Sequence, residues 1–266
     1  MIKKIRLFVN EQKPDAFKIA KMVEEEFLKN GFIIDEEDYD LGIAIGGDGS
    51  FLNMVRNTNF DSKPYYVGIN AGTLGFMQEV KPNEINKLIK EILDEKYKTD
   101  EIGIQETTII TDDNKYNFYS LNEIIVKEPE DKVINIDVKI DNDLLEKYTG
   151  DGLLIASSYG STAQNLSYNG SIVYPTFSTL QITPMGPVNS KVYRALPNSV
   201  IVPSNSLITL LSNSIHRRYS INIDGVRKVF NDVISIETTV KDKIIKVLRF
   251  SHYNFPQKIN EKILSN

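Results

Sequence analysis

The alternation of apolar and polar residues divides the chain into two regions. Up to about residue 97, short apolar runs alternate with stretches in which apolar residues recur every three or four positions. In Asn83–Leu93, for example, Ile85, Leu88, Ile89 and Ile92 fall on one helical face. We therefore expect strands at Lys4–Val9, Leu41–Ile45 and Tyr65–Ile69, and helices at Asp15–Lys29, from Phe51–Arg56 onward and at Asn83–Leu93. Strand–helix alternation predicts an α/β layer with a parallel sheet.

The pattern changes near Thr99, where short β-rich runs separated by turn-forming Asp, Asn and Ser clusters begin. The expected strands are Thr107–Thr111, Asn117–Ser120, Ile124–Val126, Ile134–Ile140, Gly152–Ala156, Ser199–Val202, Leu207–Leu211, Tyr219–Ile223, Val233–Thr238 and Ile244–Phe250. We predict an α/β domain over residues 1–98, a mostly β domain over residues 99–250, and a tail or short helix over residues 251–266.

Composition narrows the classes of function. The chain has 266 residues, no cysteine and two histidines, His216 and His252. A disulfide framework, thiol catalysis and a Cys-ligated metal are excluded, and a His-rich zinc site is not expected. The net charge of −5 does not favour nucleic-acid binding. No apolar run reaches transmembrane length, and the N-terminus has no signal-peptide core. We expect a cytoplasmic protein that binds neither nucleic acid nor a membrane.

The most informative motif is Gly46-Gly47-Asp48-Gly49, which follows an apolar run and precedes a helix-like stretch. A strand that ends in a glycine loop and continues as a helix presents backbone N–H groups and a helix N-terminus, which attract phosphate. The carboxylate of Asp48 points beyond simple phosphate binding, to a metal ion, a sugar hydroxyl or a base that removes a proton. Gly-Gly-Asp-Gly is the phosphate-loop signature of kinases that include 6-phosphofructokinases, diacylglycerol and sphingosine kinases, and NAD kinases.

Three further motifs follow along the chain. Asn70–Phe76 (Asn-Ala-Gly-Thr-Leu-Gly-Phe) comes directly after a predicted strand, and Asn122-Glu123 precedes another. The third motif has two parts: Thr149–Gly152 (Thr-Gly-Asp-Gly) stands before a third strand, and that strand runs into Gly160–Ala163 (Gly-Ser-Thr-Ala), which opens a short helix. An amide followed by an acid can bind sugar hydroxyls and an adenine edge. Taken singly, each motif also fits a structural explanation as a turn, a solvated strand start or a helix N-cap.

Together and in this order, the four motifs resemble the NAD kinase family over about residues 40–226, where Ile223-Asp224-Gly225 matches the late Asp-Gly of the family. The resemblance implies a phosphofructokinase-like α/β N-terminal domain with a parallel sheet and a mostly β, dinucleotide-binding C-terminal domain. It implies transfer of the γ-phosphoryl group of ATP, or of polyphosphate, to the adenosine-ribose 2′-hydroxyl of NAD. It also implies a divalent metal, usually Mg²⁺, and a homo-oligomer, a tetramer or dimer with shared sites.

The resemblance also implies roles for individual residues. Asp48 would be the general base, a form of help worth about 10²–10⁴-fold. Gly46, Gly47 and Gly49 would shape the phosphate loop. Residues that would contact the nucleotides are Leu52, Phe76, Asn122, Glu123, Thr149, Asp151, Thr162, Ala163, Gln164, Ser167, Gly186 and Asp224. Metal ligands, the phosphoryl donor, the number of subunits and allosteric regulation are left open.

Two departures from the family pattern bear on the dinucleotide. Gln164 stands where the family often has a tyrosine, and glutamine cannot stack on a ring equally well. Thr149 stands where many members carry an arginine, which predicts loose selection between NAD and NADH because the nicotinamide half lacks a fixed charge.

Two alternatives to an NAD kinase stand beside this reading. One is a diacylglycerol- or sphingosine-type lipid kinase, which shares Gly-Gly-Asp-Gly and a β-rich second domain. The other is a non-catalytic dinucleotide-binding regulator. Asp48 argues against the regulator, since binding alone needs no base.

Overall fold

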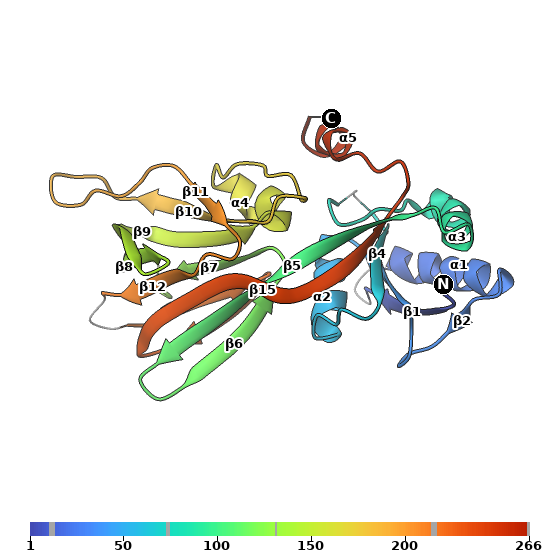
Figure 1. The fold of residues 1–266 in the computed structure, drawn as a ribbon, viewed down its shortest axis with the longest axis horizontal. Helices are drawn as coiled ribbons and strands as arrows, with labels where there is room; N and C mark the ends of the chain where they lie inside the picture. The colour runs from blue at the N-terminus through green and yellow to red at the C-terminus, as the bar shows by residue number, and fades with distance from the viewer. Residues whose placement is uncertain (11–13, 73–74, 131, 214–216, 265–266) are drawn as a thin grey trace. The chain divides into compact units, whose positions relative to one another are not determined.

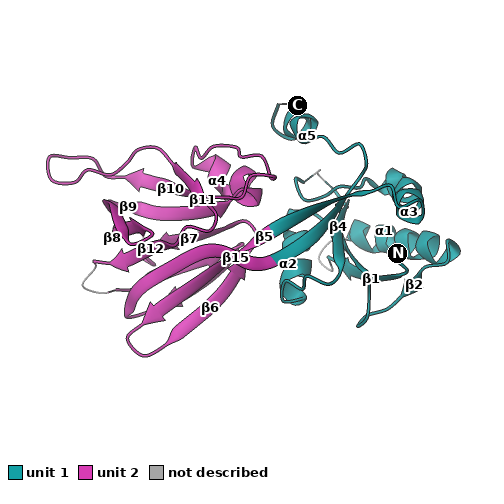
Figure 2. Ribbon diagram, in the orientation of Figure 1, with its two compact units in different colours: residues 1–102, 244–266 teal, residues 103–243 magenta. Residues whose placement is uncertain are grey.

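The structure, a computed structural model, divides the chain into two compact units (Figures 1 and 2). It describes residues 1–10, 14–72, 75–130, 132–213 and 217–264. Residues 1–102 and 244–266 form the first unit, and residues 103–243 form the second. The chain passes from one unit to the other within two long strands, β5 (Lys98–Thr111) and β15 (Val233–Arg249).

The first unit contains a parallel sheet in the order β15-β4-β3-β1-β2. Its other strands are β1 (Lys4–Val9), β2 (Ile33–Ile34), β3 (Leu41–Gly46) and β4 (Tyr65–Asn70). Every residue of β3 is buried, which is why its sequence is an unbroken apolar run rather than an alternating one. The expected α/β character of this region is confirmed.

The three longest helices of the first unit each bury an apolar face. Val23 and Phe27 of one helix and Leu88, Ile89 and Ile92 of another join the sheet residues in a single hydrophobic core. The helices are α1 (Pro14–Lys29), α2 (Asp48–Asn57), the 3₁₀ turn η1 (Pro82–Glu84), α3 (Ile85–Leu93), α5 (Phe255–Ile259) and the π-helical turn η3 (Asn260–Leu264). Helix α2 begins earlier than its apolar residues predict, so its first residue is the aspartate of the glycine motif.

The second unit is largely β, as expected. Its strand order is β14-β13-β7-β9-β8-β12-β15, and β10 pairs with β9 and β11, while β5 pairs with β15 and β6. The pairs that β9 makes with β7, β8 and β10 are antiparallel. The bounds are β6 (Lys115–Ser120), β7 (Glu123–Lys127), β8 (Ile134–Ile140), β9 (Asp143–Ser157), β10 (Thr179–Pro187), β11 (Val200–Pro203), β12 (Ile208–Ser212), β13 (Tyr219–Ile223) and β14 (Val226–Phe230).

Several elements differ from the prediction. Strands β2, β10 and β14 were not expected, and two predicted strands at the end of the chain are one continuous strand, β15. The predicted short helix after residue 160 is the 3₁₀ turn η2 (Tyr159–Thr162) followed by α4 (Gln164–Ser167).

The ends of the two units also differ from the predicted domains. The sequence pattern grouped residues 244–250 with the β-rich region and set residues 251–266 apart as a tail, whereas residues 244–266 belong to the first unit. The cause is the parallel pairing of the end of β15 with the start of β4, which returns the chain to the first sheet. Pairing between segments so far apart leaves no local pattern in the sequence.

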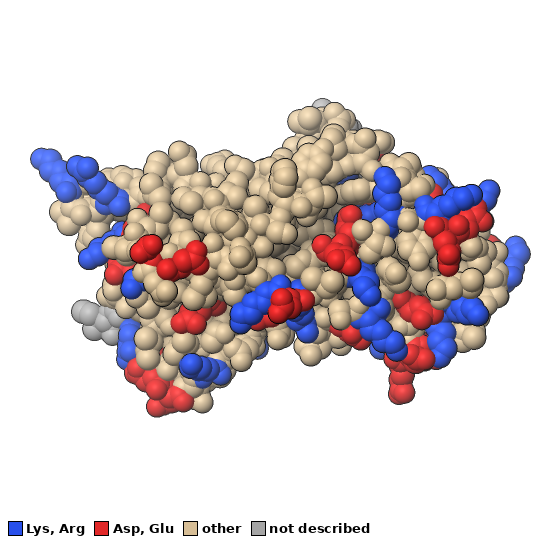
Figure 3. Space-filling model, in the orientation of Figure 1, with Lys and Arg blue, Asp and Glu red and all other residues tan. Residues whose placement is uncertain are grey.

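The surface carries charges of both signs, as the composition of the chain leads us to expect. Acidic and basic side chains are intermixed on the visible face of each unit (Figure 3). Within the described residues, no helix is both long enough and apolar enough to cross a membrane.

Candidate active site

The Gly-Gly-Asp-Gly motif forms the junction between β3 and α2. Strand β3 ends at Gly46, Gly47 is the N-cap, and Asp48 is the first residue of the helix. Gly46 has no space for a Cβ, because the hydroxyl of Ser50 occupies that position. The Ser50 hydroxyl in turn lies 3.3 Å from both the backbone nitrogen of Gly47 and Nδ2 of Asn10. The motif is therefore a tight turn that ends at a helix N-terminus, as predicted.

The Asp48 carboxylate is held by the second motif. The backbone N–H groups of Phe76 and Met77 donate to its two oxygens, each at 2.9 Å. Gly75 lies against the same carboxylate, which fills the space that a Cβ on Gly75 would need. Asp48 and Phe76 are half-buried. The structure thus brings together two motifs that are separated in sequence, while Thr73 and Leu74 of the second motif lie outside the described residues.

Gln78 is a site residue that the motifs did not include. Its side chain is fully buried, and its Nε2 donates to the carbonyl oxygen of Gly47 at 2.7 Å. Leu52, predicted to flank the nucleotide, is half-buried on α2, and Gly49 is exposed. The one signal in the sequence for Gln78 is a polar residue between Met77 and Val80, both of which are buried.

A second group of predicted residues meets in the second unit. Asp224 lies in the tight turn between β13 and β14, with a φ of 46°. Its carboxylate accepts the backbone N–H groups of Leu121 at 2.6 Å, Asn122 at 2.8 Å and Glu123 at 3.2 Å. Asp224 is 7% exposed. It therefore holds the backbone of the Asn-Glu segment in place, a positioning role that its sequence motif did not reveal.

Asn122 and Glu123 carry buried acceptor atoms. Within the described residues, Oδ1 of Asn122 and Oε2 of Glu123 are buried and accept no hydrogen bond. Burial, together with the nearby Asp224 charge, raises the pKa of Glu123 from its ordinary 4.5 to about 8, against a hydrogen bond from the Gln164 backbone, which lowers it. Unpaired buried polar atoms are costly and favour a ligand that completes their hydrogen bonds.

The Gly-Ser-Thr-Ala turn packs directly on this segment. Ser157 donates its hydroxyl to the Leu121 carbonyl at 2.6 Å and accepts the Gly160 N–H at 3.1 Å. Gly160 lies so close to the Asn122 backbone that no Cβ would fit. Thr162 and Ala163 are half-buried beyond this contact. The two motifs are therefore packed against each other in the second unit.

Asn165 organises the interior of the same turn and was not singled out by the sequence. It is fully buried, accepts the Thr183 hydroxyl at 2.6 Å and donates to the Ser161 carbonyl at 3.2 Å. The neighbouring Gln164 and Ser167 are exposed. The turn thus presents two of the predicted contact residues outward while Asn165 holds it to the sheet.

The Gly-Asp-Gly motif near residue 151 is not a loop. It lies inside the continuous strand β9, where the prediction placed it before a strand. Gly150 and Gly152 are required because their neighbours leave no room for a Cβ. Asp151 is exposed, and its carboxylate lies against Gly186, which has a φ of 55°. The glycines therefore serve close strand packing and leave Asp151 on the surface.

Thr149 is engaged inside the sheet. Its hydroxyl donates to Oδ1 of Asn135 at 2.8 Å, and the residue is 6% exposed. An arginine at this position would have to displace that contact.

Comparison with known proteins identifies the family. A family model for the ATP-NAD kinase N-terminal domain matches residues 8–97, and one for the C-terminal domain matches residues 121–246. The chain is 35% identical to the NAD kinase of Finegoldia magna, over 98% of this chain and 97% of that protein. It is 32% identical to the NAD kinase of Geobacillus stearothermophilus, over 93% and 92%.

This chain belongs to the ATP-NAD kinase family. It is accordingly a phosphotransferase, and nothing favours the lipid-kinase alternative. The four motifs that suggested an NAD kinase lie inside the two matched ranges, so the resemblance drawn from the sequence is confirmed.

Solved structures of similar fold agree. Yeast NADH kinase complexed with NADH has a TM-score of 0.83 and 22% identity, covering 100% of this chain and 89% of that one. An NAD kinase from Archaeoglobus fulgidus in complex with ATP has a TM-score of 0.76 and 18% identity, covering 98% of both chains. At these identities the likeness establishes the fold.

The donor set for a metal in this NAD kinase family member is sparse. In the part of the chain that the structure describes, no three Asp, Glu or His side chains gather into a potential metal site. Mg²⁺ usually keeps several waters and binds through one or two carboxylates plus substrate phosphates. The half-buried Asp48 is one such carboxylate beside a helix N-terminus.

Proposed function

We propose that this protein transfers the γ-phosphoryl group of ATP to the 2′-hydroxyl of the adenosine ribose of NAD, giving NADP and ADP. The observation that carries the proposal is the Asp48 carboxylate, which two backbone N–H groups fix at the N-terminus of α2 while it stays half-exposed. A base must be held in one orientation and still reach its substrate.

In the proposed step, the ribose 2′-oxygen attacks the γ-phosphorus and its proton passes to Asp48. The bond between the 2′-oxygen and phosphorus forms, the bond from phosphorus to the β-phosphate oxygen breaks, and ADP leaves. Each carboxylate oxygen offers about two acceptor directions, and only one at each is taken by Phe76 or Met77. The remaining directions can accept the hydroxyl proton.

The helix N-terminus supports the same reaction. Backbone N–H groups at the start of α2 and the positive end of its dipole favour phosphate oxygens. Phosphoryl transfer depends mostly on positioning and on charge stabilisation of this kind. Gly47 and Gly49 have open space around the position of a Cβ, which leaves room for a phosphate to approach the backbone.

The adenosine of NAD is the proposed partner of Asn122 and Glu123. Ribose hydroxyls and the adenine amino group can donate to the unpaired Oδ1 of Asn122, and a ribose hydroxyl can accept from the protonated carboxyl of Glu123. Residues proposed to complete the nucleotide contacts are Leu52, Phe76, Asp151, Thr162, Ala163, Gln164, Ser167 and Gly186. Asp224 would act through the Asn-Glu segment that it holds.

The finer parts of the proposal concern the metal, the subunits and selectivity. Mg²⁺ would arrive on the ATP phosphates and neutralise charge as the phosphoryl group moves. We further propose a phosphofructokinase-like relationship for the first unit, a homo-oligomer with shared sites and, from the buried Thr149, loose selection between NAD and NADH. Cytoplasmic location stays a prediction from composition.

One assay tests the reaction. The purified full chain is incubated with NAD, Mg²⁺ and either ATP or polyphosphate, and NADP is read out with an NADP-specific dehydrogenase. We expect NADP formation that EDTA abolishes. No NADP with either donor would overturn the proposed reaction, and activity that survives EDTA would overturn the metal role.

A further inference from the structure

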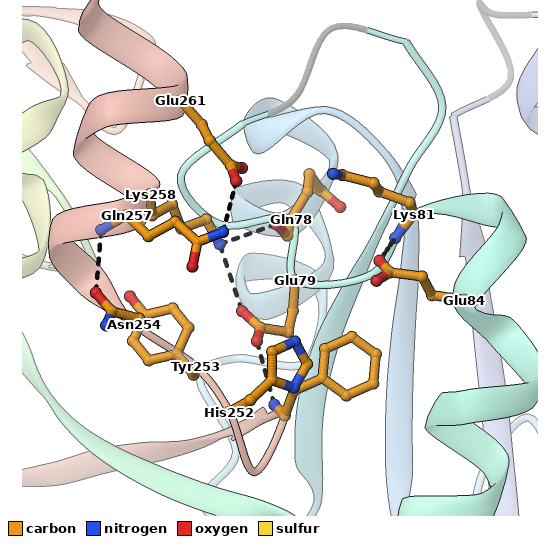
Figure 4. A pocket seen from close by; sticks show the side chains of 11 residues that line it. Gln78, Glu79, Lys81, Glu84, His252, Tyr253, Asn254, Gln257, Lys258 and Glu261 are labelled. Carbon is orange, nitrogen blue, oxygen red and sulfur yellow. Dashed lines mark hydrogen bonds and ion pairs between the residues drawn. The ribbon is translucent and has the colours of Figure 1, made fainter. Parts of the chain in front are cut away.

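The C-terminal helix α5 makes a contact that none of the four motifs anticipated. The family model for the C-terminal domain ends at residue 246, so α5 also lies outside both matched ranges. The helix is nevertheless tied into the first unit by a buried lysine. Lys258 is 8% exposed, and Figure 4 shows its side chain directed at Gln78 and Glu79.

Lys258 is connected to the Asp48 carboxylate through hydrogen bonds at both ends of the backbone segment 76–78. Nζ of Lys258 donates to the backbone carbonyl of Gln78 at 2.9 Å. The two residues before Gln78 are Phe76 and Met77, whose N–H groups hold Asp48. The side chain of Gln78 also donates to the Gly47 carbonyl at 2.7 Å. The lysine therefore hydrogen-bonds to the same backbone segment that orients the proposed base.

The lysine is itself held in place by its surroundings. Glu79 accepts from Lys258 and Arg249, each at 3.4 Å, and from the backbone of Phe250 at 3.1 Å. The ring of Tyr253 lies 5.5 Å from the Lys258 ammonium. Asn254 is the N-cap of α5, and its Oδ1 accepts the backbone N–H of Gln257 at 3.0 Å. A side chain held by this many contacts can fix the position of the backbone segment to which it donates.

The charges around Lys258 act in opposite directions. Burial and the Arg249 charge lower its pKa to about 8, against the carboxylates of Glu79 and Asp48, which raise it. Other charged or titratable side chains that line the same pocket are Lys81, Glu84, His252, Tyr253 and Glu261 (Figure 4). Asp100 faces Arg249 at 2.8 Å and offsets its charge.

We propose that Lys258 is a positioning residue for the phosphoryl-transfer reaction, holding residues 76–78 so that their N–H groups orient the Asp48 carboxylate. The proposal rests on the proposed role of Asp48 as the base. It assigns the C-terminal helix a part in catalysis, although α5 contributes no group that touches the reacting atoms. A misplacement of about 1 Å at a reacting group can cost about 10²-fold in rate. Loss of the hydrogen bond from Lys258 should therefore lower kcat.

The test compares Lys258→Met, Lys258→Arg and the control Lys262→Met. Lys262 is half-buried on the next helical turn, and its replacement removes the same charge away from the 76–79 segment. We expect Lys258→Met to lower kcat about 10-fold or more, with both KM values within about threefold. Hydrogen exchange should quicken at the amides of Phe76 and Met77. Lys258→Arg should recover most of the activity, and the control should match the wild type.

The dependence of kcat on pH provides the second measurement. It tests the role of Lys258 even if Lys258→Met does not fold. Deprotonation of Lys258 replaces a charge-assisted hydrogen bond to Gln78 with a weaker neutral one. Wild-type kcat should therefore fall as pH rises through about 8, and Lys258→Arg should lack this fall because guanidinium stays charged.

Three results would overturn the proposal. They are a Lys258→Met kcat equal to that of the control, unchanged exchange at residues 76–77, or an alkaline limb that Lys258→Arg shares with the wild type. A failure of the proposed reaction is distinguishable, since wild-type protein would then make no NADP. The exchange measurement would still report whether Lys258 holds the segment.

Discussion

The carboxylate of Asp48 occupies the space that a side chain on Gly75 would need. The two residues belong to different motifs, and the contact explains why a glycine stands before Phe76 in the second one. The glycine permits the backbone to come close enough for Phe76 and Met77 to donate to the carboxylate. The second motif is thus, in this chain, a cradle for the aspartate of the first.

Gly75→Ala should therefore damage activity through Asp48. The new methyl group cannot share its position with the carboxylate, so either the carboxylate turns away or the 75–77 backbone moves. We expect kcat to fall about 10- to 100-fold, because the base loses its orientation. Steady-state kinetics with NAD and ATP measure the loss of kcat. Thermal unfolding measures any loss of stability that the displaced backbone causes. Turnover within about twofold of the wild type would show that the orientation of Asp48 is unimportant.

Gly49→Ala, in contrast, should not destabilise the fold. Gly49 is exposed in the first turn of α2, and no atom lies within 4 Å of the position of its Cβ. Alanine favours a helix over glycine by up to about 1 kcal/mol, so the melting temperature should stay the same or rise. If phosphate approaches this backbone, the methyl group should nevertheless lower kcat/KM for ATP. Unchanged kinetics would place the phosphate elsewhere.

The buried carboxyl group of Glu123 should make stability depend on pH. Its pKa is about 8 in the folded protein, against an ordinary value of 4.5. The folded state therefore binds the proton more tightly than the unfolded chain. The associated stability is fully present below about pH 4.5, declines as pH rises and is lost above about pH 8, by an amount on the order of a few kcal/mol.

Glu123→Gln, which mimics the protonated acid, should remove this decline. Urea unfolding of ligand-free protein between about pH 5 and 9 measures it, with Glu101→Gln as a control because Glu101 is exposed on β5. The stability of Glu123→Gln relative to the wild type should increase with pH, and that of the control should not. A parallel pH dependence in all three proteins would contradict the assignment.

Much of the first unit was predictable because its signals are local. The unbroken apolar run of Leu41–Ile45 and the helical period in Asn83–Leu93 each report their own burial. The same holds for the Gly-Gly-Asp-Gly turn, whose strand, loop and helix are contiguous in sequence. Strand β10 was missed because Thr179–Pro187 contains two prolines and a glycine, residues that argue against a strand.

The parts of the site that could not be predicted depend on contacts between distant segments. The carboxylate of Asp224 reaches the backbone at Asn122, and the ammonium of Lys258 reaches that of Gln78. Neither partner carries a sequence feature that names the other. The sequence of the polar C-terminal segment predicts a tail. In the structure, the pairing of β15 with β4 places this segment in the first unit.

Asp48→Asn is the most direct test of the proposed base, and the structure changes what is expected of it. From the sequence, asparagine keeps the size and most of the hydrogen bonding of the aspartate. In the structure, both carboxylate oxygens accept backbone N–H groups, so the NH₂ of asparagine would face Phe76 or Met77. The substitution should therefore cost about 1–2 kcal/mol of stability in addition to its effect on catalysis.

The catalytic effect should still be separable from this cost. Asparagine cannot accept the 2′-hydroxyl proton, so kcat should fall about 10²-fold or more while NAD affinity changes little. NAD titration and turnover on the same preparation, at a temperature well below unfolding, compare the two. Because Gly75→Ala displaces the carboxylate without removing it, a deeper loss of kcat in Asp48→Asn would identify proton acceptance as the missing function. Turnover within a few-fold of the wild type would exclude Asp48 as the base, and loss of NAD binding together with activity would make it a ligand-positioning residue instead.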